Sequence, residues 1–150
     1  MILCGSITDS ELRARLLSLA DGMGWDSWIT HDAGLLSPML EALSTPADAI
    51  ISDHAETLGQ LTDTGAARIL IGSESKTVAD PELFVIDVAE SNEAIRQHLY
   101  NCINTTRLKS RFRESAGREP ITRLPRHQEL VSALIRHRGD PVALLVVQVD

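Results

Sequence analysis

Short apolar runs alternate with helix-period segments through the first 95 residues of the chain. Each run is bounded by polar or turn-forming residues, as buried strands are. The predicted strands lie at residues 2–4, 26–30, 48–53, 68–72 and 83–87. Because buried strands that alternate with helices form parallel sheets covered on both faces, the pattern predicts an α/β fold with a five-stranded parallel sheet.

Helix-starting residues and apolar spacing place helices between these strands. The polar run at residues 8–11 precedes a helix with one apolar face, and Asp9 falls where its cap belongs. Ser37 and Pro38 predict the start of a second helix, with serine as the cap and proline in the first turn. The inward-facing residues expected in the three helices are Leu12, Leu16, Leu19, Met23, Met39, Leu40, Leu43, Leu58 and Leu61.

The connection between the fourth and fifth predicted strands is short. It comprises residues 74–82, whereas a parallel crossover with a packed helix needs at least ~10 to 12 residues. We therefore expect the fourth helix of the fold to be very short or absent. This predicts either an altered contact surface on that side of the sheet or a fifth strand that docks in an unusual way.

A long helix is predicted over residues 91–116, with Ser91 near its start. The residues expected to pack back on the sheet are Ile95, Leu99, Cys102 and Ile103. Beyond them the apolar face thins to Leu108 and Phe112, the expected contacts if the helix pairs with a second copy. Polar residues at 101 and 104–106 interrupt the apolar positions that a two-stranded coiled coil needs, so a paired helix and a monomeric linker helix both stay open.

Charge divides the chain near residue 95. Residues 1–95 contain 4 Lys and Arg against 16 Asp and Glu, and residues 96–150 contain 10 against 5, so the two parts have net charges of −12 and +5. An acidic amino-terminal part argues against nucleic acid as a partner. The basic run at residues 107–113 is typical of the solvated face of a helix. We therefore expect neither a nucleic-acid partner nor a membrane.

Length and composition fit one soluble domain with its own core, at 150 residues and 43% hydrophobic content. No apolar run approaches the ~18 residues of a membrane helix, and residues 1–6 do not have the form of a signal peptide. Cys4 and Cys102 are too few for a disulfide framework or a metal site of the usual spacing. These features predict a cytoplasmic protein with reduced thiols.

The order of elements and the position of Asp53 resemble the receiver domains of response regulators. Asp53 ends the third apolar strand, where receivers carry their phosphoacceptor aspartate, and in open α/β sheets the chemistry lies at the carboxyl ends of the strands. The resemblance covers about residues 1–95 and implies a flavodoxin-like sheet. It also implies two acidic residues after the first strand, a Ser or Thr after the fourth and a Lys after the fifth.

Most of those pocket positions carry other residues in this chain. Gly5 and Ser6 stand where the resemblance implies the acidic pair, Ser73 fits the fourth-strand position, and Asp87 replaces the lysine. Aspartyl phosphorylation needs Mg²⁺, which takes oxygen ligands in a near-octahedral array. Two like charges about 5 Å apart at an effective dielectric near 20 repel by roughly 3 kcal/mol, so Asp87 would oppose a phosphoryl group on Asp53.

These departures favour a vestigial pocket. We expect a pseudo-receiver with no catalytic residue, no metal site and no cofactor, in which Asp53 keeps only the position of a phosphoacceptor. The alternative is a working phospho-receiver in a two-component phosphorelay, with Mg²⁺ held by displaced acids such as Asp9 or Asp32. Mg²⁺-dependent modification of Asp53 distinguishes the two.

The end of the chain resembles the opening of a GGDEF domain, the diguanylate cyclase family. It keeps the family's Leu124-Pro125 pair, an amphipathic helix and the apolar run at residues 142–149. Where the family has the first Asp of its D-x-D metal motif, this chain has Gln148, and only Asp150 remains. A neutral amide is a much weaker ligand for Mg²⁺. The resemblance thus implies a degenerate and incomplete domain that makes no cyclic di-GMP by itself.

Three segments follow from this interpretation: a pseudo-receiver at residues 1–95, a linker helix at 91–116 and a truncated start of a GGDEF-like domain at 117–150. The expected function is a non-enzymatic regulatory module that controls a cyclic di-GMP signalling output through protein contacts, in a parent that is a cyclase or a phosphodiesterase. Because the run at 142–149 has no sheet of its own, we expect self-association through this terminal strand or the linker helix.

Overall fold

The computed structural model describes residues 1–61, 64–72, 80 and 82–116. The chain divides into two compact units, Met1–Leu108 and Lys109–Asp150. The helix and strand expected for a GGDEF-like start at residues 117–150 lie outside the described residues. The fold that positions the candidate site belongs to the first unit.

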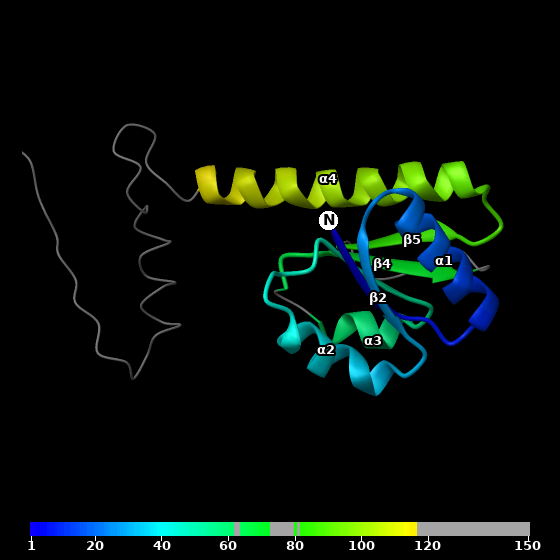
Figure 1. The fold of residues 1–150 in the computed structure, drawn as a ribbon. Coiled ribbons are helices and arrows are strands. Elements are labelled where there is room, and N and C mark those ends of the chain that lie inside the picture. Colours follow the sequence, from blue (N-terminus) through cyan, green and yellow to red (C-terminus); the bar gives the residue numbers. More distant parts are fainter. Residues whose placement is uncertain (62–63, 73–79, 81, 117–150) are drawn as a thin grey trace, which may run out of the picture. The chain divides into compact units, whose positions relative to one another are not determined.

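Five parallel strands form one sheet in the order β2-β1-β3-β4-β5. The strands are β1 (Ile2–Ser6), β2 (Asp26–Thr30), β3 (Ala49–Ser52), β4 (Ala67–Gly72) and β5 (Leu83–Asp87). All five predicted strands are present, and this order is that of flavodoxin-like folds. The predicted fold class, an α/β fold with a flavodoxin-like five-stranded parallel sheet, is confirmed (Figure 1).

The first strand is longer than predicted. Gly5 and Ser6 were expected after its end, but both pair with β2 and β3, with Gly5 opposite Ile29 and Ile51. A Cβ atom at Gly5 would lie 2.5 Å from both the carbonyl oxygen and the Cγ2 of Ile51, so only glycine lets the two strands approach this closely. The residues that follow the strand are therefore Ile7 and Thr8.

Helix α1 (Ser10–Gly22) and the amino-terminal part of helix α4 (Asn92–Ala116) cover one face of the sheet (Figure 1). Their buried residues share one core cluster with alternate residues of the strands, such as Leu3 and Ile51. Trp25 and Tyr100 add an edge-to-face ring contact to this layer, with centroids 5.0 Å apart. This face holds most of the buried apolar side chains and thus the main core.

The opposite face is covered by the 3₁₀ turn Ala33–Leu35 and two short helices, α2 (Leu36–Ala42) and α3 (Ala55–Gly59) (Figure 1). The prediction that Ser37 caps the second helix is wrong. The 3₁₀ turn precedes this helix, and the Asp32 carboxylate caps the turn by accepting a hydrogen bond from Gly34 N–H at 2.8 Å. A smaller core cluster, including Cys4, Leu36 and Leu58, lies under these elements.

A buried arginine fixes the segment that precedes β5. Arg68 on β4 is 7% exposed, and its guanidinium lies 3.0 Å from Asp80 and 3.6 Å from Glu82. It also donates to the Leu58 carbonyl at 3.2 Å. These partners compensate the loss of water around the charge. Residues 73–79 and 81, where the fourth helix was expected to be short or absent, lie outside the described residues.

Helix α4 begins as predicted, with Ser91 Oγ accepting from Ala94 N–H at 3.2 Å. The four residues expected to pack on the sheet are all buried: Ile95, Leu99, Cys102 and Ile103. Leu108 is 66% exposed and Phe112 is 76% exposed. None of the helices within the described ranges is long and apolar enough to cross a bilayer.

Candidate functional site

Asp53 lies at the carboxyl edge of the sheet, directly after β3. An open hollow of about 870 Å³ adjoins it. The hollow is lined by residues from the loops after β1, β3 and β5, from the end of β4 and from helices α1 and α3: Asp9, Leu12, Asp53, His54, Ala55, Glu56, Thr57, Leu70, Ile71, Gly72 and Val88. Asp53 therefore lies at the edge where open α/β sheets carry their sites.

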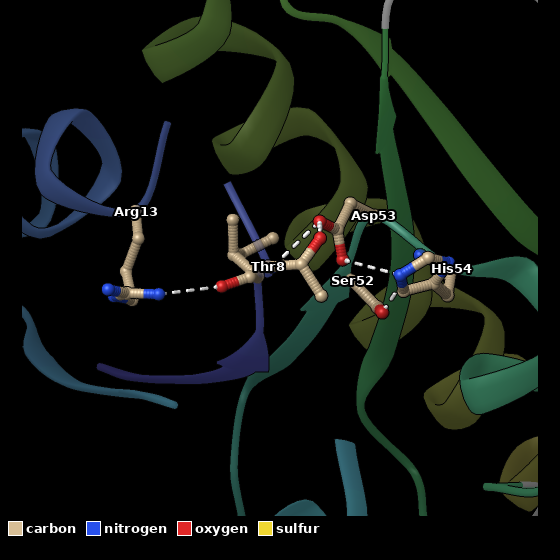
Figure 2. A network of polar contacts seen from close by, with 6 residues as sticks. Thr8, Arg13, Ser52, Asp53 and His54 are labelled. Carbon is tan, nitrogen blue, oxygen red and sulfur yellow. Dashed lines mark hydrogen bonds and ion pairs between the residues drawn. The ribbon is translucent and has the colours of Figure 1, made fainter. Parts of the chain in front are cut away.

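Thr8 holds one oxygen of the Asp53 carboxylate (Figure 2). Its backbone N–H donates to Asp53 Oδ2 at 2.7 Å, and its hydroxyl donates to the same oxygen. Two contacts fix this loop: Ile7 is fully buried in the core, and Arg13 of α1 donates to the Ile7 carbonyl at 3.0 Å. A hydroxyl and an amide thus occupy the oxygen that points toward the β1–α1 loop.

The second carboxylate oxygen is buried. Asp53 Oδ1 has no hydrogen-bond partner among the described residues, and His54 Nε2 lies 3.8 Å from it. His54 N–H donates to the hydroxyl of Ser52 at 3.1 Å, which sets the turn that follows β3 (Figure 2). The side chain of Asp53 as a whole is 14% exposed. An unsatisfied buried carboxylate oxygen is unusual and marks this place as a candidate site.

The other predicted pocket positions that the structure describes do not line the hollow. Gly5 offers no side chain, and Ser6, opposite Ser52 in the sheet, is fully buried, with no described partner for its hydroxyl. Asp87 lies at the end of β5, where its carboxylate accepts from Ala89 N–H at 2.8 Å, and it is not among the residues lining the hollow. Ser73 lies outside the described residues.

The two displaced acids considered for Mg²⁺ take different positions. Asp9 lines the hollow, but its Oδ1 accepts from Glu11 N–H at 2.8 Å and Leu12 N–H at 3.0 Å. It is therefore the cap of α1, as the sequence predicted. Asp32 caps the 3₁₀ turn and does not line the hollow.

These groups do not fit a receiver-type Mg²⁺ site. The ion requires several oxygen ligands in near-octahedral geometry. At the described edge, Thr8 occupies Asp53 Oδ2, and the cap occupies Asp9 Oδ1. No three His, Cys, Asp or Glu side chains gather to hold a metal anywhere in the described ranges.

Arg15 is a residue that the sequence analysis missed. This residue of α1 binds the β5–α4 loop. Its guanidinium donates to the Val88 carbonyl at 2.6 Å, the Glu90 carbonyl at 2.5 Å and Asn92 Oδ1 at 2.6 Å. These acceptors lie 73 to 77 residues away in the chain. No local pattern at position 15 indicates such a contact, which exists only because the sheet brings α1 beside the end of β5.

The two thiols lie away from this edge. Cys4 is buried on the α2/α3 face and Cys102 on the α1/α4 face. Burial raises the pKa of each thiol to about 11. Both are therefore neutral at physiological pH and fill space in the core.

Two solved structures share this architecture. One is the signal receiver domain of an HD domain-containing protein from Pseudomonas fluorescens Pf-5, with a TM-score of 0.62 and 15% identity over 73% of this chain and 90% of that chain. The fold is that of a signal receiver domain. A sensor protein from Polaromonas sp. JS666 is also similar in structure, with a TM-score of 0.56 and 14% identity over 70% of this chain and 97% of that chain.

The similarity between this chain and these proteins is one of three-dimensional structure. No protein-family model matches the sequence, and no curated protein matches it either. At such low identity the shared architecture identifies the sheet order and the edge where a site belongs. The chemistry at that edge follows from the residues of this chain.

Proposed function

We propose that the chain is a non-enzymatic signal-transduction module, a pseudo-receiver that works through protein contacts without phosphoryl transfer at Asp53. The state of the Asp53 carboxylate carries this proposal. Thr8 donates two hydrogen bonds to Oδ2. Oδ1 is buried and has no hydrogen-bond partner among the described residues, and the His54 Nε2 nitrogen lies 3.8 Å from it.

Phosphorylation would have to overcome these contacts. One carboxylate oxygen must be free to attack the donor, so either the Thr8 bonds break or the buried Oδ1 becomes accessible. The carboxylate would then be replaced by an acyl phosphate of greater negative charge, beside a hollow that Asp9 and Glu56 already line. A like charge about 5 Å away opposes this by roughly 3 kcal/mol at an effective dielectric near 20.

In this proposal, α4 and residues 117–150 transmit the signal from the receiver-like domain to an attached output domain. Residues 117–150 resemble the start of a degenerate GGDEF domain, so the attached output is one of cyclic di-GMP signalling. Leu108 and Phe112 support self-association, since both are large apolar side chains more than half exposed on α4. The apolar run at 142–149 is a second candidate for contact with another chain.

The proposal is tested with phosphoryl donors. The full chain is incubated with Mg²⁺ and acetyl phosphate and examined by intact mass, and is titrated with beryllofluoride by NMR. An active receiver domain serves as the positive control and Asp53→Asn as the matched variant. We expect no adduct, and no change in the spectra of either wild type or variant when beryllofluoride is added. A saturable, Mg²⁺-dependent adduct that Asp53→Asn abolishes would overturn the proposal.

A working phospho-receiver is the second candidate function. It is favoured by the position of Asp53 at the carboxyl edge, beside an open hollow that Asp9 also lines. For this function Asp9 must leave the cap of α1 to bind Mg²⁺. Asp9→Asn, which keeps an acceptor for the cap, would then abolish the adduct without unfolding the chain.

Self-association is tested separately. If α4 pairs with a second copy, the full chain sediments at twice its mass of 16.4 kDa, and Leu108→Ser with Phe112→Ser restores the monomer. Arg111→Ser, an exposed change on the same stretch of helix, is the control and leaves the dimer intact. A wild-type chain that is monomeric at all concentrations would remove the helix-pairing part of the proposal.

A further inference from the structure

We infer that Arg15 is a positioning residue that couples the Asp53 edge to the start of α4 through helix α1. The inference rests on the proposed function in one respect, because a signalling module needs a route from its site to its output helix. The contacts themselves form a continuous chain. They run from Asp53 to Thr8, along α1 to Arg15, and across to the β5–α4 loop.

The first part of this route connects Asp53 with α1. Thr8 directly precedes Asp9, whose carboxylate caps α1 through Glu11 and Leu12. Arg13, one turn into the helix, donates back to the Ile7 carbonyl at 3.0 Å. The loop that contacts Asp53 is therefore bonded to the first turn of α1, and Figure 2 shows the hydrogen bond that Arg13 donates to this loop. A change at the carboxylate acts on the position of this helix end.

The second part connects α1 with α4. Arg15 uses three guanidinium nitrogens for three separate acceptors, two backbone carbonyls and the side chain of Asn92, at 2.5 to 2.6 Å. Asn92 is the first residue of α4. The guanidinium fork is rigid and directional, so it fixes the loop in one geometry. A lysine has one compact charge and cannot span these three acceptors.

The backbone N–H groups of the β5–α4 loop also form hydrogen bonds that hold this loop in place. Val88 N–H donates to the Gly72 carbonyl at 3.3 Å, Ala89 N–H to Asp87 Oδ1 at 2.8 Å, and Glu90 N–H to the Asp87 carbonyl at 3.2 Å. The Glu90 carboxylate lies 3.0 Å from His98 Nδ1, further along α4. A displacement of this loop therefore moves the beginning of α4, and its three amides provide a direct readout.

The test is amide hydrogen exchange of residues 88–90 in the full chain. In Arg15→Ala we expect exchange there to rise by at least about tenfold, because hydrogen bonds from a charged donor are lost. Arg15→Lys keeps the charge but should behave like Arg15→Ala. Ser18→Ala, an exposed change on the same helix, is the matched control and should leave the rates unchanged. Wild-type rates in Arg15→Lys would overturn the inference.

The coupling itself is tested by a double-mutant cycle. Asp53→Ala removes the acceptor of Thr8 and should raise exchange at residues 88–90 by about threefold when Arg15 is present. In the Arg15→Ala background the same change should have no effect on these amides. An equal effect in both backgrounds, or none in either, would overturn the inference. Phosphoryl donors are absent throughout, so the outcome is independent of whether Asp53 is modified.

Discussion

Two aspartates flank strand β3, and they have opposite surroundings. Asp48 precedes the strand at the amino edge of the sheet, where Oδ2 accepts from Ile2 N–H at 2.8 Å and Oδ1 pairs with Arg107 at 2.6 Å. Asp53 follows the strand at the carboxyl edge, where Oδ2 is held by Thr8 and Oδ1 has no described hydrogen-bond partner. One carboxylate has both oxygens bonded and the other has one.

The difference separates a structural role from a candidate functional one. Asp48 joins β1 to α4, and its charge is matched by a guanidinium, so its contacts stabilise the fold. Asp53 sits beside an open hollow with a buried oxygen left over, which contributes little stability. The amino edge of the sheet is therefore held by the contacts of Asp48, and the carboxyl edge at Asp53 adjoins the open hollow. Four measurements test this contrast.

The largest effect is expected from Asp48→Ala. Both of its hydrogen bonds are lost, one of them to a charged partner, so the free energy of unfolding should fall by about 2 kcal/mol. Denaturant unfolding at pH 7 measures this, with Asp21→Ala, an exposed change on α1, as the control. If the two variants were equally stable, the structural role assigned to Asp48 would be wrong.

The same contact predicts a pH dependence. Burial raises the pKa of the Asp48 carboxyl, but the bond from Ile2, the bond and charge of Arg107 and the chain's amino terminus outweigh burial, so the net pKa lies below the ordinary 3.8. A lowered folded-state pKa gives stability that is complete above the unfolded pKa and lost as the pH falls through the folded one. The stability difference between wild type and Asp48→Ala should therefore shrink below about pH 4. A difference that persisted at pH 2 would contradict the assignment.

A smaller effect is expected at the other end of the strand. Asp53→Ala removes the acceptor of Thr8 but also the unsatisfied oxygen, and these changes offset each other. The free energy of unfolding should change by less than about 1 kcal/mol in either direction. Both variants are measured under the same conditions. If Asp53→Ala lost as much unfolding free energy as Asp48→Ala, both aspartates would have a structural role.

The smallest effect concerns the helix end of the Asp48 contact. Arg107 is 49% exposed in its side chain, so Arg107→Ala should weaken the docking of α4 by only about 0.5 kcal/mol. Labelling of the Cys102 thiol by a disulfide reagent should then rise about twofold, while Cys4 on the opposite face keeps its rate. Equal acceleration at both cysteines would indicate global unfolding and no local release of α4.

Periodicity was sufficient to predict much of this fold. The ranges 26–30 and 83–87 match strands β2 and β5, and the four apolar residues expected under α4 are buried. These features follow from local patterns, because burial of one face imposes a regular spacing. The extent of β1 did not follow, since Gly5 and Ser6 have the composition of a turn while the sheet places them inside the strand.

The candidate site was predictable only at its centre. Asp53 ends an apolar strand, and the topology fixes which edge it occupies. Thr8, Arg15 and Arg107 were missed because each acts across 45 or more residues of sequence. Ser37 was predicted as a helix cap because the 3₁₀ turn that Asp32 caps leaves no periodic pattern in the sequence. Long-range polar contacts of this kind form only when the sheet is assembled, so the local sequence pattern does not predict them.

Gly5 sets a boundary for protein engineers who want to install metal-dependent chemistry in this scaffold. Because a Cβ atom there would collide with the Ile51 backbone, a carboxylate introduced at position 5 would force the two central strands apart before it could bind anything. Redesign would have to start at the loop beyond the strand, with Thr8 as the accessible position. The close approach of β1 and β3 at Gly5 thus limits where a designed metal site can be introduced into this fold.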